Sequence, residues 1–425
     1  MGVRKLFNCW IDKLANLLKK IFPLDSRGRF LLQRLRAALF KLVDPDVRTG
    51  RQLERLLPDL ESWAYERSGS IFLVISPVQF REDEGQRATN FTQELVRRGI
   101  GVLFVYWRWP GQEIVPADSN SGILQIPMDV FLRKPELILR SFNRIKKNIL
   151  IEYPHPDLFG PLSTAQAAGW ITVYDLVDDW AAFQHVGQAA WYDPAFERYL
   201  LLHADVVLAV RQNLVDRVIS WTGRQVVLVP NGLVPDIDTI DRPRYLEQGH
   251  ITLGYFGYLS DAWFDWPLLL EVAERHPAWR IYLIGYGMSL EPGLLPGNIV
   301  FLGKKPRSEL ASYAANWDVA IVPFKQGGVA RGADPIKTYE YLAMDLPVVA
   351  SGVQPPSGGE EHVLCARNSL EFARLVEKAA ASSTEPDRCR FAGSCTWEER
   401  LNLLFSAMAE SPRVRQKKFL FGGVL

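Results

Sequence analysis

The feature that most constrains this chain is an alternation of short apolar runs with amphipathic stretches, and the alternation occurs twice. In the first half, the apolar runs are predicted strands at residues 71–76, 102–107, 148–152, 171–175, 205–210 and 226–229. Strands that are apolar on both faces and alternate with helices are typical of a parallel sheet covered by helices. The second half repeats the pattern, with predicted strands at residues 251–256, 281–284, 299–302, 319–322 and 347–350.

A turn signal and a polar stretch separate the two halves. Pro230, Asn231 and Gly232 form the turn, and polar sequence continues to His250. We therefore predict an α/β protein with two Rossmann-like, doubly wound parallel-sheet domains that face each other across a cleft. A chain of 425 residues suits two such domains with extensions. The expected division is a helical extension at 1–68, a first domain at 69–235, a second domain at 250–395, and a C-terminal helix with a basic tail at 396–425.

Composition excludes several classes of protein. The net charge of +1 gives no general attraction to polyanions, so no nucleic-acid partner is expected. The four cysteines are too few and too scattered for a disulfide framework, and none has zinc-ligand spacing. The chain has no apolar run long enough to predict a transmembrane helix. We expect a cytoplasmic protein.

The first 41 residues are strongly basic. They contain ten Lys and Arg residues, opposed only by Asp12 and Asp25, and apolar residues recur at helical spacing. We interpret them as two amphipathic helices divided at Pro23. Such a segment is typical of an anchor at an anionic membrane surface, here the inner face of the plasma membrane. The alternative, that the apolar stripe packs on the protein's own core, carries equal weight.

A glycine-rich stretch in the second half indicates an anion site. Three glycines lie between residues 327 and 332, and a predicted helix follows, with Asp334 as its N-cap and Pro335 at its first position. Free backbone N–H groups and the helix dipole suit a diphosphate. Lys337 and Arg331 are candidate cations, and the Glu340 carboxylate can accept hydrogen bonds from ribose hydroxyls. A capped helix with a solvated Lys337–Glu340 pair is the equally weighted alternative.

The segment Asp334–Ala350, with the sequence DPIKTYEYLAMDLPVVA, resembles the donor-site signature of group 1 (family 4-like) glycosyltransferases with the GT-B fold. The resemblance extends in order over residues 71–404 and includes 85–99, 173–180, 203–207 and 229–232. It implies transfer of a hexosyl group from a nucleoside-diphosphate sugar to a saccharide or lipid-linked saccharide, in the synthesis of a cell-surface polysaccharide or glycolipid. It also implies no metal and no cofactor besides the nucleotide sugar. The implied nucleotide-binding residues are Gly257, Arg331, Pro335, Lys337 and Glu340.

The sequence departs from that family in two places. Gly332 lies where many members have a glutamate, eight residues before Glu340. Residues 257–266 lack the arginine and lysine that grip the diphosphate in many members. Lys337, with Arg331 or Lys325, is then expected to neutralise the charge of the leaving diphosphate, and this is a catalytic role for Lys337. Three alternatives remain: a non-catalytic GT-B binding protein, a sugar-nucleotide epimerase, and a phosphorylase, for which no pyridoxal lysine environment is identified.

Carboxylates follow two predicted strands of the first half. Asp175 ends one strand, and Asp178 and Asp179 follow in the loop, where they are expected to face the cleft. One of them is predicted to be the general base or to bind sugar hydroxyls, with Asp178 and Asp179 preferred as catalytic residues. Capping is the alternative. Glu152 and His155 end the preceding strand in the same way, and with Asp175 they are the acceptor-side candidates.

Overall fold

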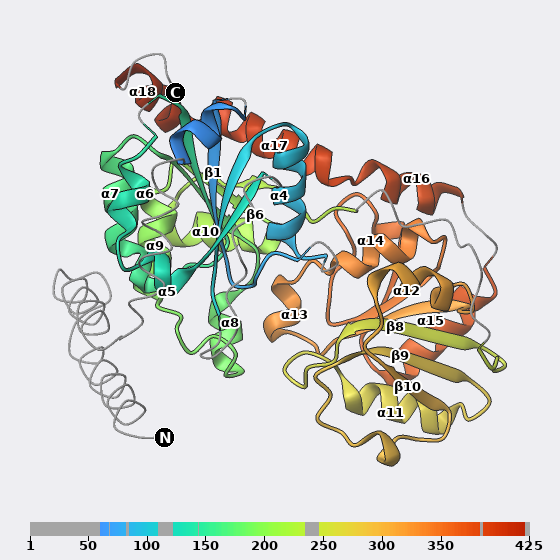
Figure 1. The fold of residues 1–425 in the computed structure, drawn as a ribbon. Helices are drawn as coiled ribbons and strands as arrows, with labels where there is room; N and C mark the ends of the chain where they lie inside the picture. Colours follow the sequence, from blue (N-terminus) through green and yellow to red (C-terminus); the bar gives the residue numbers. More distant parts are fainter. Residues whose placement is uncertain are drawn as a thin grey trace, which may run out of the picture.

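The computed structural model describes residues 60–67, 69–81, 85–108, 122–142, 144–233, 246–382 and 386–420. The basic segment 1–41, on which the membrane prediction depends, lies outside the described residues. Two α/β domains lie side by side, each with a parallel sheet between helices (Figure 1). This arrangement confirms the predicted fold class.

The first domain has a seven-stranded parallel sheet. Its strand order is β3-β2-β1-β4-β5-β6-β7, formed by β1 (Ser70–Ser76), β2 (Gly101–Tyr106), β3 (Ile123–Pro127), β4 (Lys146–Ile151), β5 (Ile171–Leu176), β6 (Val206–Ala209) and β7 (Val227–Leu228). The helices are α4 (Arg87–Arg97), α5 (Met128–Phe131), α6 (Pro135–Leu139), α7 (Phe159–Ala167), α8 (Trp180–His185), α9 (Pro194–His203) and α10 (Gln212–Thr222). The sequence patterns did not predict β3, α5, α6 or α8, which are short elements with little periodicity.

The second domain repeats the same topology with six parallel strands. Its order is β10-β9-β8-β11-β12-β13, formed by β8 (Thr252–Tyr258), β9 (Arg280–Tyr286), β10 (Ile299–Gly303), β11 (Val319–Pro323), β12 (Val348–Ser351) and β13 (Val363–Ala366). The helices are α11 (Trp266–Arg275), α12 (Arg307–Ala314), α13 (Gly328–Gly332), α14 (Ile336–Ala343) and α15 (Ser369–Ala380). In both sheets the order reverses next to the first strand, which is where such folds bind ligands.

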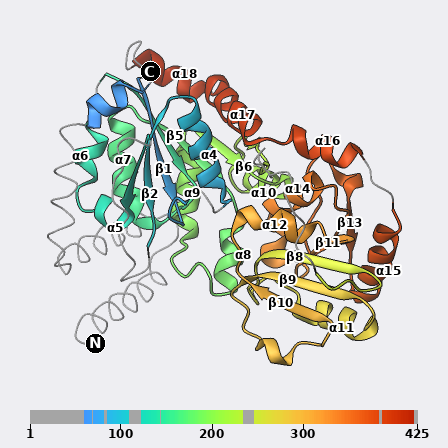
Figure 2. The ribbon, with the colours of Figure 1, turned by 45° about the vertical axis from the view of Figure 1, so that its right-hand side comes forward.

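The C-terminal helices return to the first domain. After α16 (Pro386–Ser394), helix α17 (Trp397–Glu410) crosses from the second domain to the first, and α18 (Pro412–Leu420) follows (Figure 2). Trp397 is buried against Phe91, with ring centroids 5.4 Å apart. Gly232 lies so close to the backbone of Cys395 and Trp397 that a side chain there has no room. The chain therefore ties the two domains together at a second crossing.

The structure corrects the prediction of a basic tail at the C-terminus. Residues 412–420 form a helix, and its cations contact the first domain. Arg413 donates to the carbonyl of Leu202 at 2.7 Å, and Lys417 pairs with the buried Asp205 at 2.7 Å. These contacts hold α18 against the first domain, where the Asp205 carboxylate also accepts hydrogen bonds from the backbone N–H and the hydroxyl of Thr172. No helix in the described ranges is long and apolar enough to cross a membrane.

Candidate functional site

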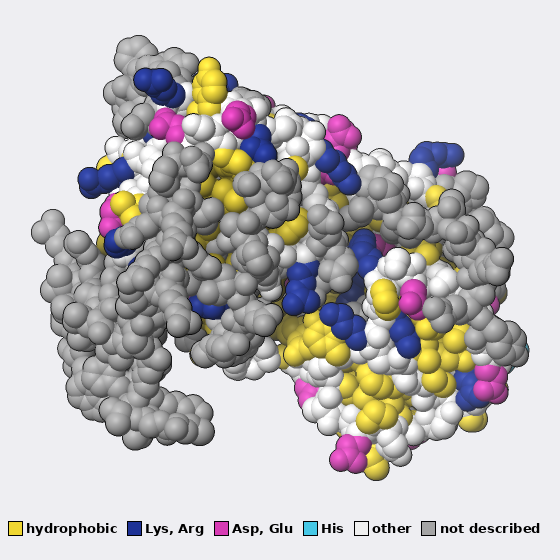
Figure 3. Space-filling model, viewed as in Figure 1, with side chains coloured by type: hydrophobic (Ala, Val, Ile, Leu, Met, Phe, Trp, Pro, Cys, Tyr) yellow, Lys and Arg dark blue, Asp and Glu magenta, His cyan; other side chains and the backbone are white. Residues whose placement is uncertain are grey.

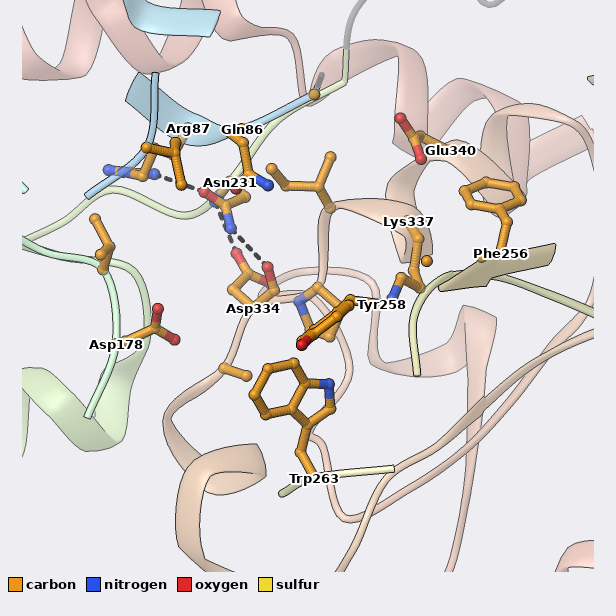
Figure 4. Close-up of a pocket in the computed structure, with 18 of the residues that line it drawn as sticks. Gln86, Arg87, Asp178, Asn231, Phe256, Tyr258, Trp263, Asp334, Lys337 and Glu340 are labelled. Carbon is orange, nitrogen blue, oxygen red and sulfur yellow. Dashed lines mark hydrogen bonds between the residues drawn. The ribbon is translucent and has the colours of Figure 1, made fainter. Parts of the chain in front are cut away.

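A pocket of about 450 Å³ lies between the two domains. Residues at or just after the carboxyl ends of β1, β4 and β5 line it from the first domain, and residues at or just after the carboxyl ends of β8, β9, β10 and β11 line it from the second. Figure 4 shows Asp178 on one side, Lys337 and Glu340 on the other, and Asp334 between them. On the face in Figure 3, Lys and Arg side chains gather where the domains meet. The carboxyl ends of the two sheets thus meet at one site, as the topology requires.

Asp334 does not cap the helix that follows it, which corrects the predicted N-cap. Helix α14 begins at Ile336, with Pro335 as its N-cap and no side-chain capping bond. The Asp334 carboxylate instead accepts a hydrogen bond from the Asn231 backbone N–H at 2.7 Å and pairs with Arg211 at 3.1 Å. Asp334 and Arg211 are almost fully buried. A buried carboxylate needs a charged partner, and the first domain supplies it.

Asp175 has a structural role, which corrects its assignment to the acceptor side. Both of its oxygens accept hydrogen bonds from Arg87, at 2.7 and 3.0 Å, and the residue has no exposed surface. Arg87 also donates to the Asn231 side chain at 3.0 Å. Arg87, Asp175, Asn231, Asp334 and Arg211 therefore form one buried network from strand β5 to the start of α14, which fixes the domains relative to each other.

The Lys337 side chain lines the pocket and packs against an aromatic ring. Its Nζ donates to the Tyr255 hydroxyl at 2.8 Å and lies 4.4 Å from the centre of the Tyr255 ring. Burial lowers the pKa of Lys337 to about 8. Gly257 has a φ of +140°, and a side chain there would lie 2.5 Å from the Lys337 Nζ. Gly257 and Lys337 are therefore adjacent, as the predicted donor site requires.

Glu340 faces a cation that the sequence patterns did not indicate. Its Oε1 lies 2.5 Å from Nη2 of Arg307, although the two groups lack hydrogen-bond geometry. Glu340 is buried and Arg307 is about a quarter exposed. Lys304 and Lys305, which follow β10 directly, line the pocket with Arg307. The sequence signal that could have indicated this cluster is the presence of three cations in residues 304–307, directly after a predicted strand. This cluster supplies positive charge that residues 257–266 lack.

Neither of the other two predicted cations lines the pocket. Arg331 lies exposed on α13, where its carbonyl accepts a hydrogen bond from Asn213 at 2.9 Å. Lys325 is exposed and donates to the carbonyl of Asp261. Both assignments are corrected, because neither residue belongs to the pocket lining. A Cβ added at Gly332 would lie 3.0 Å from the Cβ of Asp179, so a glutamate there would face a like charge.

Of the two preferred aspartates, only Asp178 lines the pocket. Burial, together with the neighbouring Asp179 charge, raises the pKa of Asp178 to about 7. Asp179 caps α8 by accepting from the Ala182 N–H at 3.1 Å, and it pairs with Arg217 at 2.5 Å. Because Asp179 does not line the pocket and its Oδ1 makes both of these contacts within the first domain, it is corrected from catalyst to cap.

Glu152 and His155 differ in their relation to the pocket. Glu152 is buried in its lining, and its Oε1 has no hydrogen-bond partner among the described residues. Burial and the charge of Asp175 raise the pKa of Glu152 well above its usual range. His155 caps a short helical turn by accepting from the Asp157 N–H at 3.3 Å and does not line the pocket. His155 is therefore corrected from acceptor-side candidate to cap.

Comparisons with known proteins agree with this geometry. Residues 253–382, which contain Gly257, Lys337 and Glu340, match the sequence model of the family described as "Glycosyl transferases group 1". The glycosyltransferase TuaH of Bacillus subtilis (strain 168), named for teichuronic acid biosynthesis, is 24% identical over 206 residues. That alignment spans 44% of this chain and 51% of TuaH, so the chain matches about half the length of this curated relative.

Solved structures share the fold at low sequence identity. The galactosyltransferase WaaB of the lipopolysaccharide outer core is 12% identical, with a TM-score of 0.53 over 79% of this chain and 99% of WaaB. A mutant O-GlcNAc transferase of Thermobaculum terrenum is also 12% identical, with a TM-score of 0.53 over 97% of this chain and 85% of that one. The chain thus has the GT-B fold. Its second domain carries the group 1 glycosyltransferase signature.

Proposed function

We propose that this protein is a glycosyltransferase that moves a hexosyl group from a nucleoside-diphosphate sugar to a saccharide or lipid-linked saccharide. The observation that carries the proposal is the position of Lys337. It lies beside Gly257 at the carboxyl end of β8, within the part of the chain that matches the family. Arg307 and Lys304 add positive charge to the same pocket. These groups suit a diphosphate leaving group.

The proposed reaction uses one group from each side of the cleft. The acceptor hydroxyl oxygen forms a bond to the anomeric carbon while the bond from that carbon to the diphosphate oxygen breaks. The Asp178 carboxylate accepts the hydroxyl proton, and Lys337 stabilises the charge that develops on the diphosphate. Glu340 is proposed to accept hydrogen bonds from the ribose once the nucleotide displaces Arg307. Pro335 positions the first turn of α14 beneath the phosphates.

Two measurements on the purified protein test the proposal. Thermal shifts against a panel of nucleoside diphosphates should give one clear stabilisation, which identifies the donor base. The protein should then slowly hydrolyse the corresponding nucleotide sugar when no acceptor is present, which releases the nucleoside diphosphate. Lys337→Met should reduce the rate of that release. A protein stabilised by none of the diphosphates would contradict the proposal.

A non-catalytic binding protein with this fold is the second candidate. The Arg307–Glu340 pair favours it, because the proposed ribose carboxylate is already occupied by a cation of the protein. Nucleotide binding without any release of diphosphate, with or without candidate acceptors, would select this alternative. The sugar-nucleotide epimerase alternative predicts a changed sugar on an intact nucleotide, which chromatography of the products detects.

We further propose that the acceptor belongs to a cell-surface polysaccharide or glycolipid, as the name of the relative TuaH suggests. The basic segment 1–41 would then hold the protein at the anionic inner face of the plasma membrane, from the cytoplasmic side. Flotation with anionic liposomes tests this. Equal flotation after removal of residues 1–22 would contradict it.

A further inference from the structure

Five aromatic side chains form a continuous strip along the pocket. They are Trp180 and Phe183 of α8 in the first domain and, in the second domain, Tyr258, Trp263 and Tyr286. Successive ring centroids are 5.6 Å apart for Trp180–Phe183, 5.8 Å for Phe183–Trp263, 5.5 Å for Trp263–Tyr258 and 5.0 Å for Tyr258–Tyr286. The Phe183–Trp263 contact joins the two domains, so the strip is continuous only when the domains have this relative placement.

The strip is open to solvent at its second-domain end. Tyr258 is 40% exposed and Tyr286 is 52% exposed, while Phe183 and Trp263 are half-buried. The backbone holds Tyr258 in place, because Gly287 lies so close to its ring that a side chain there would collide with it. An aromatic surface of this extent, fixed and left in contact with solvent, is typical of a ligand-binding site.

Polar groups lie beside the rings. Asp178 follows β5 two residues before Trp180, and it lines the same pocket. Lys304 lies with its Nζ 5.2 Å from the centre of the Tyr286 ring. Figure 4 shows Trp263 and Tyr258 below Asp334, on the side of the pocket away from Glu340. The strip is therefore separate from the proposed ribose position and adjacent to the proposed base.

This combination matches the chemistry of a sugar ring. The face of an aromatic ring carries partial negative charge, and it attracts the C–H groups on one face of a pyranose as it attracts the edge of another ring. The hydroxyls of the same sugar need polar partners such as Asp178. An alkyl chain would cover the rings equally well, but it would bury the Asp178 carboxylate without offering a hydrogen-bond donor.

We infer that the aromatic strip of Trp180, Phe183, Trp263, Tyr258 and Tyr286 is the binding surface for the acceptor saccharide, whose ring stacks across the two domains. The inference rests on the proposed function, since the strip and the donor site share one pocket. It makes Phe183 and Trp263 determinants of acceptor affinity. The nucleotide site, with Lys337 and Glu340, is independent of both residues.

Saturation-transfer NMR with octyl β-glucoside below its micelle concentration tests the inference, because this probe carries both a sugar ring and an alkyl chain. Saturation should reach the C–H protons of the sugar ring. Trp263→Leu and Phe183→Leu should each weaken binding about fivefold. Trp263→Phe should retain most of the signal. Tyr65→Leu, at an exposed aromatic outside the pocket, is the matched control and should change nothing.

Three results would overturn the inference. They are saturation confined to the octyl chain, an unchanged signal in Trp263→Leu, and no transfer to the sugar at millimolar concentration. Nucleotide thermal shifts, measured on the same variants, should equal that of the wild type and show that the fold is intact. If the wild type bound the sugar but no nucleotide diphosphate, the proposed function would fail while the sugar-binding strip would stand.

Discussion

Asn231 donates two hydrogen bonds to Asp334, one from its backbone N–H to the carboxylate at 2.7 Å and one from its side chain to the backbone carbonyl at 2.6 Å. Asn231 belongs to the segment that leaves the first domain, and Asp334 precedes the helix that carries Lys337 and Glu340. This contact sets the distance between the acceptor side and the donor side of the pocket. It therefore connects the fold to the proposed chemistry.

Asp334→Ala should destabilise the protein strongly. Arg211 would remain buried without its carboxylate partner, and removal of one member of such a pair costs about 3–5 kcal/mol. Chemical denaturation measures the loss in the free energy of unfolding. Asp387→Ala, which removes an exposed partner of Arg390, is the control and should change stability by about 0.5 kcal/mol or less. Equal effects of the two substitutions would show that the interdomain network does not stabilise the fold.

Lys337→Ala should lower turnover by on the order of a hundredfold, because the leaving diphosphate loses a positive charge in the transition state. The pKa of Lys337 is lowered to about 8 by burial, so the free protein holds its cation below pH 8 and loses it above. Nucleotide affinity should accordingly fall as the pH rises through about 8. In Lys337→Met this pH dependence should disappear. A Lys337→Ala variant with wild-type turnover would remove Lys337 from the mechanism.

Asp178 should impose a pH dependence on transfer. Its pKa is about 7, so the ionised base predominates only above that pH, and kcat/KM should rise through about pH 7. Asp178→Asn should abolish the rise and most of the activity.

The stability of the protein should show the opposite trend with pH. A carboxyl with a raised pKa contributes stability below its unfolded pKa of about 4, and this contribution is lost as the pH rises through about 7.

The matched stability experiment compares the wild type with Asp178→Asn by denaturation at pH 5 and pH 8. The wild type should lose more stability than the variant between these pH values, because the variant has no carboxyl to ionise at this position. The Asp178 charge also raises the pKa of the buried Glu152, so Asp178→Asn removes that effect too and adds to the expected difference between the two proteins. An identical loss in the two proteins would contradict the raised pKa of Asp178.

Glu340→Ala should weaken nucleotide binding through the ribose. Calorimetry with a nucleoside diphosphate and its 2′-deoxy analogue separates this effect from general damage. The wild type should prefer the ribose form, and the variant should bind both forms equally. Loss of a hydrogen bond to a charged group weakens binding by about tenfold. Arg307→Gln, which removes the ion-pair partner, should retain the preference for ribose. A preference that survives in Glu340→Ala would contradict the proposed contact.

Gly257→Ala should reduce nucleotide affinity, because the added methyl group would lie 2.5 Å from the Lys337 Nζ and displace it. The φ of +140° at this position adds backbone strain. Gly293→Ala is the matched control, since the space around that glycine is open. Calorimetry should show weaker binding in the first variant and wild-type binding in the second. Equal binding in both variants would show that Lys337 tolerates displacement.

The sequence patterns located most of the strands, because a buried parallel strand requires a continuous apolar run. They also placed Lys337 and Glu340 on one helix. Short elements such as α8 and α13 escaped prediction, since a single helical turn has too few residues to show periodicity. Arg331 and Lys325 were selected by proximity in sequence, and neither of them lines the pocket.

The sequence by itself therefore determined the fold class and the resemblance to the family, because these depend on local pattern and on the order of motifs. The contact between Gly257 and Lys337, which are far apart in the sequence, came from the tertiary structure. Only the tertiary structure decided which of several similar charges face the cleft. Asp175, Asp178 and Asp179 lie within five residues, yet one pairs with Arg87, one caps a helix and one lines the pocket. Partners distant in sequence, such as Arg87, Arg217 and Arg307, make that distinction, and sequence spacing carries no record of them.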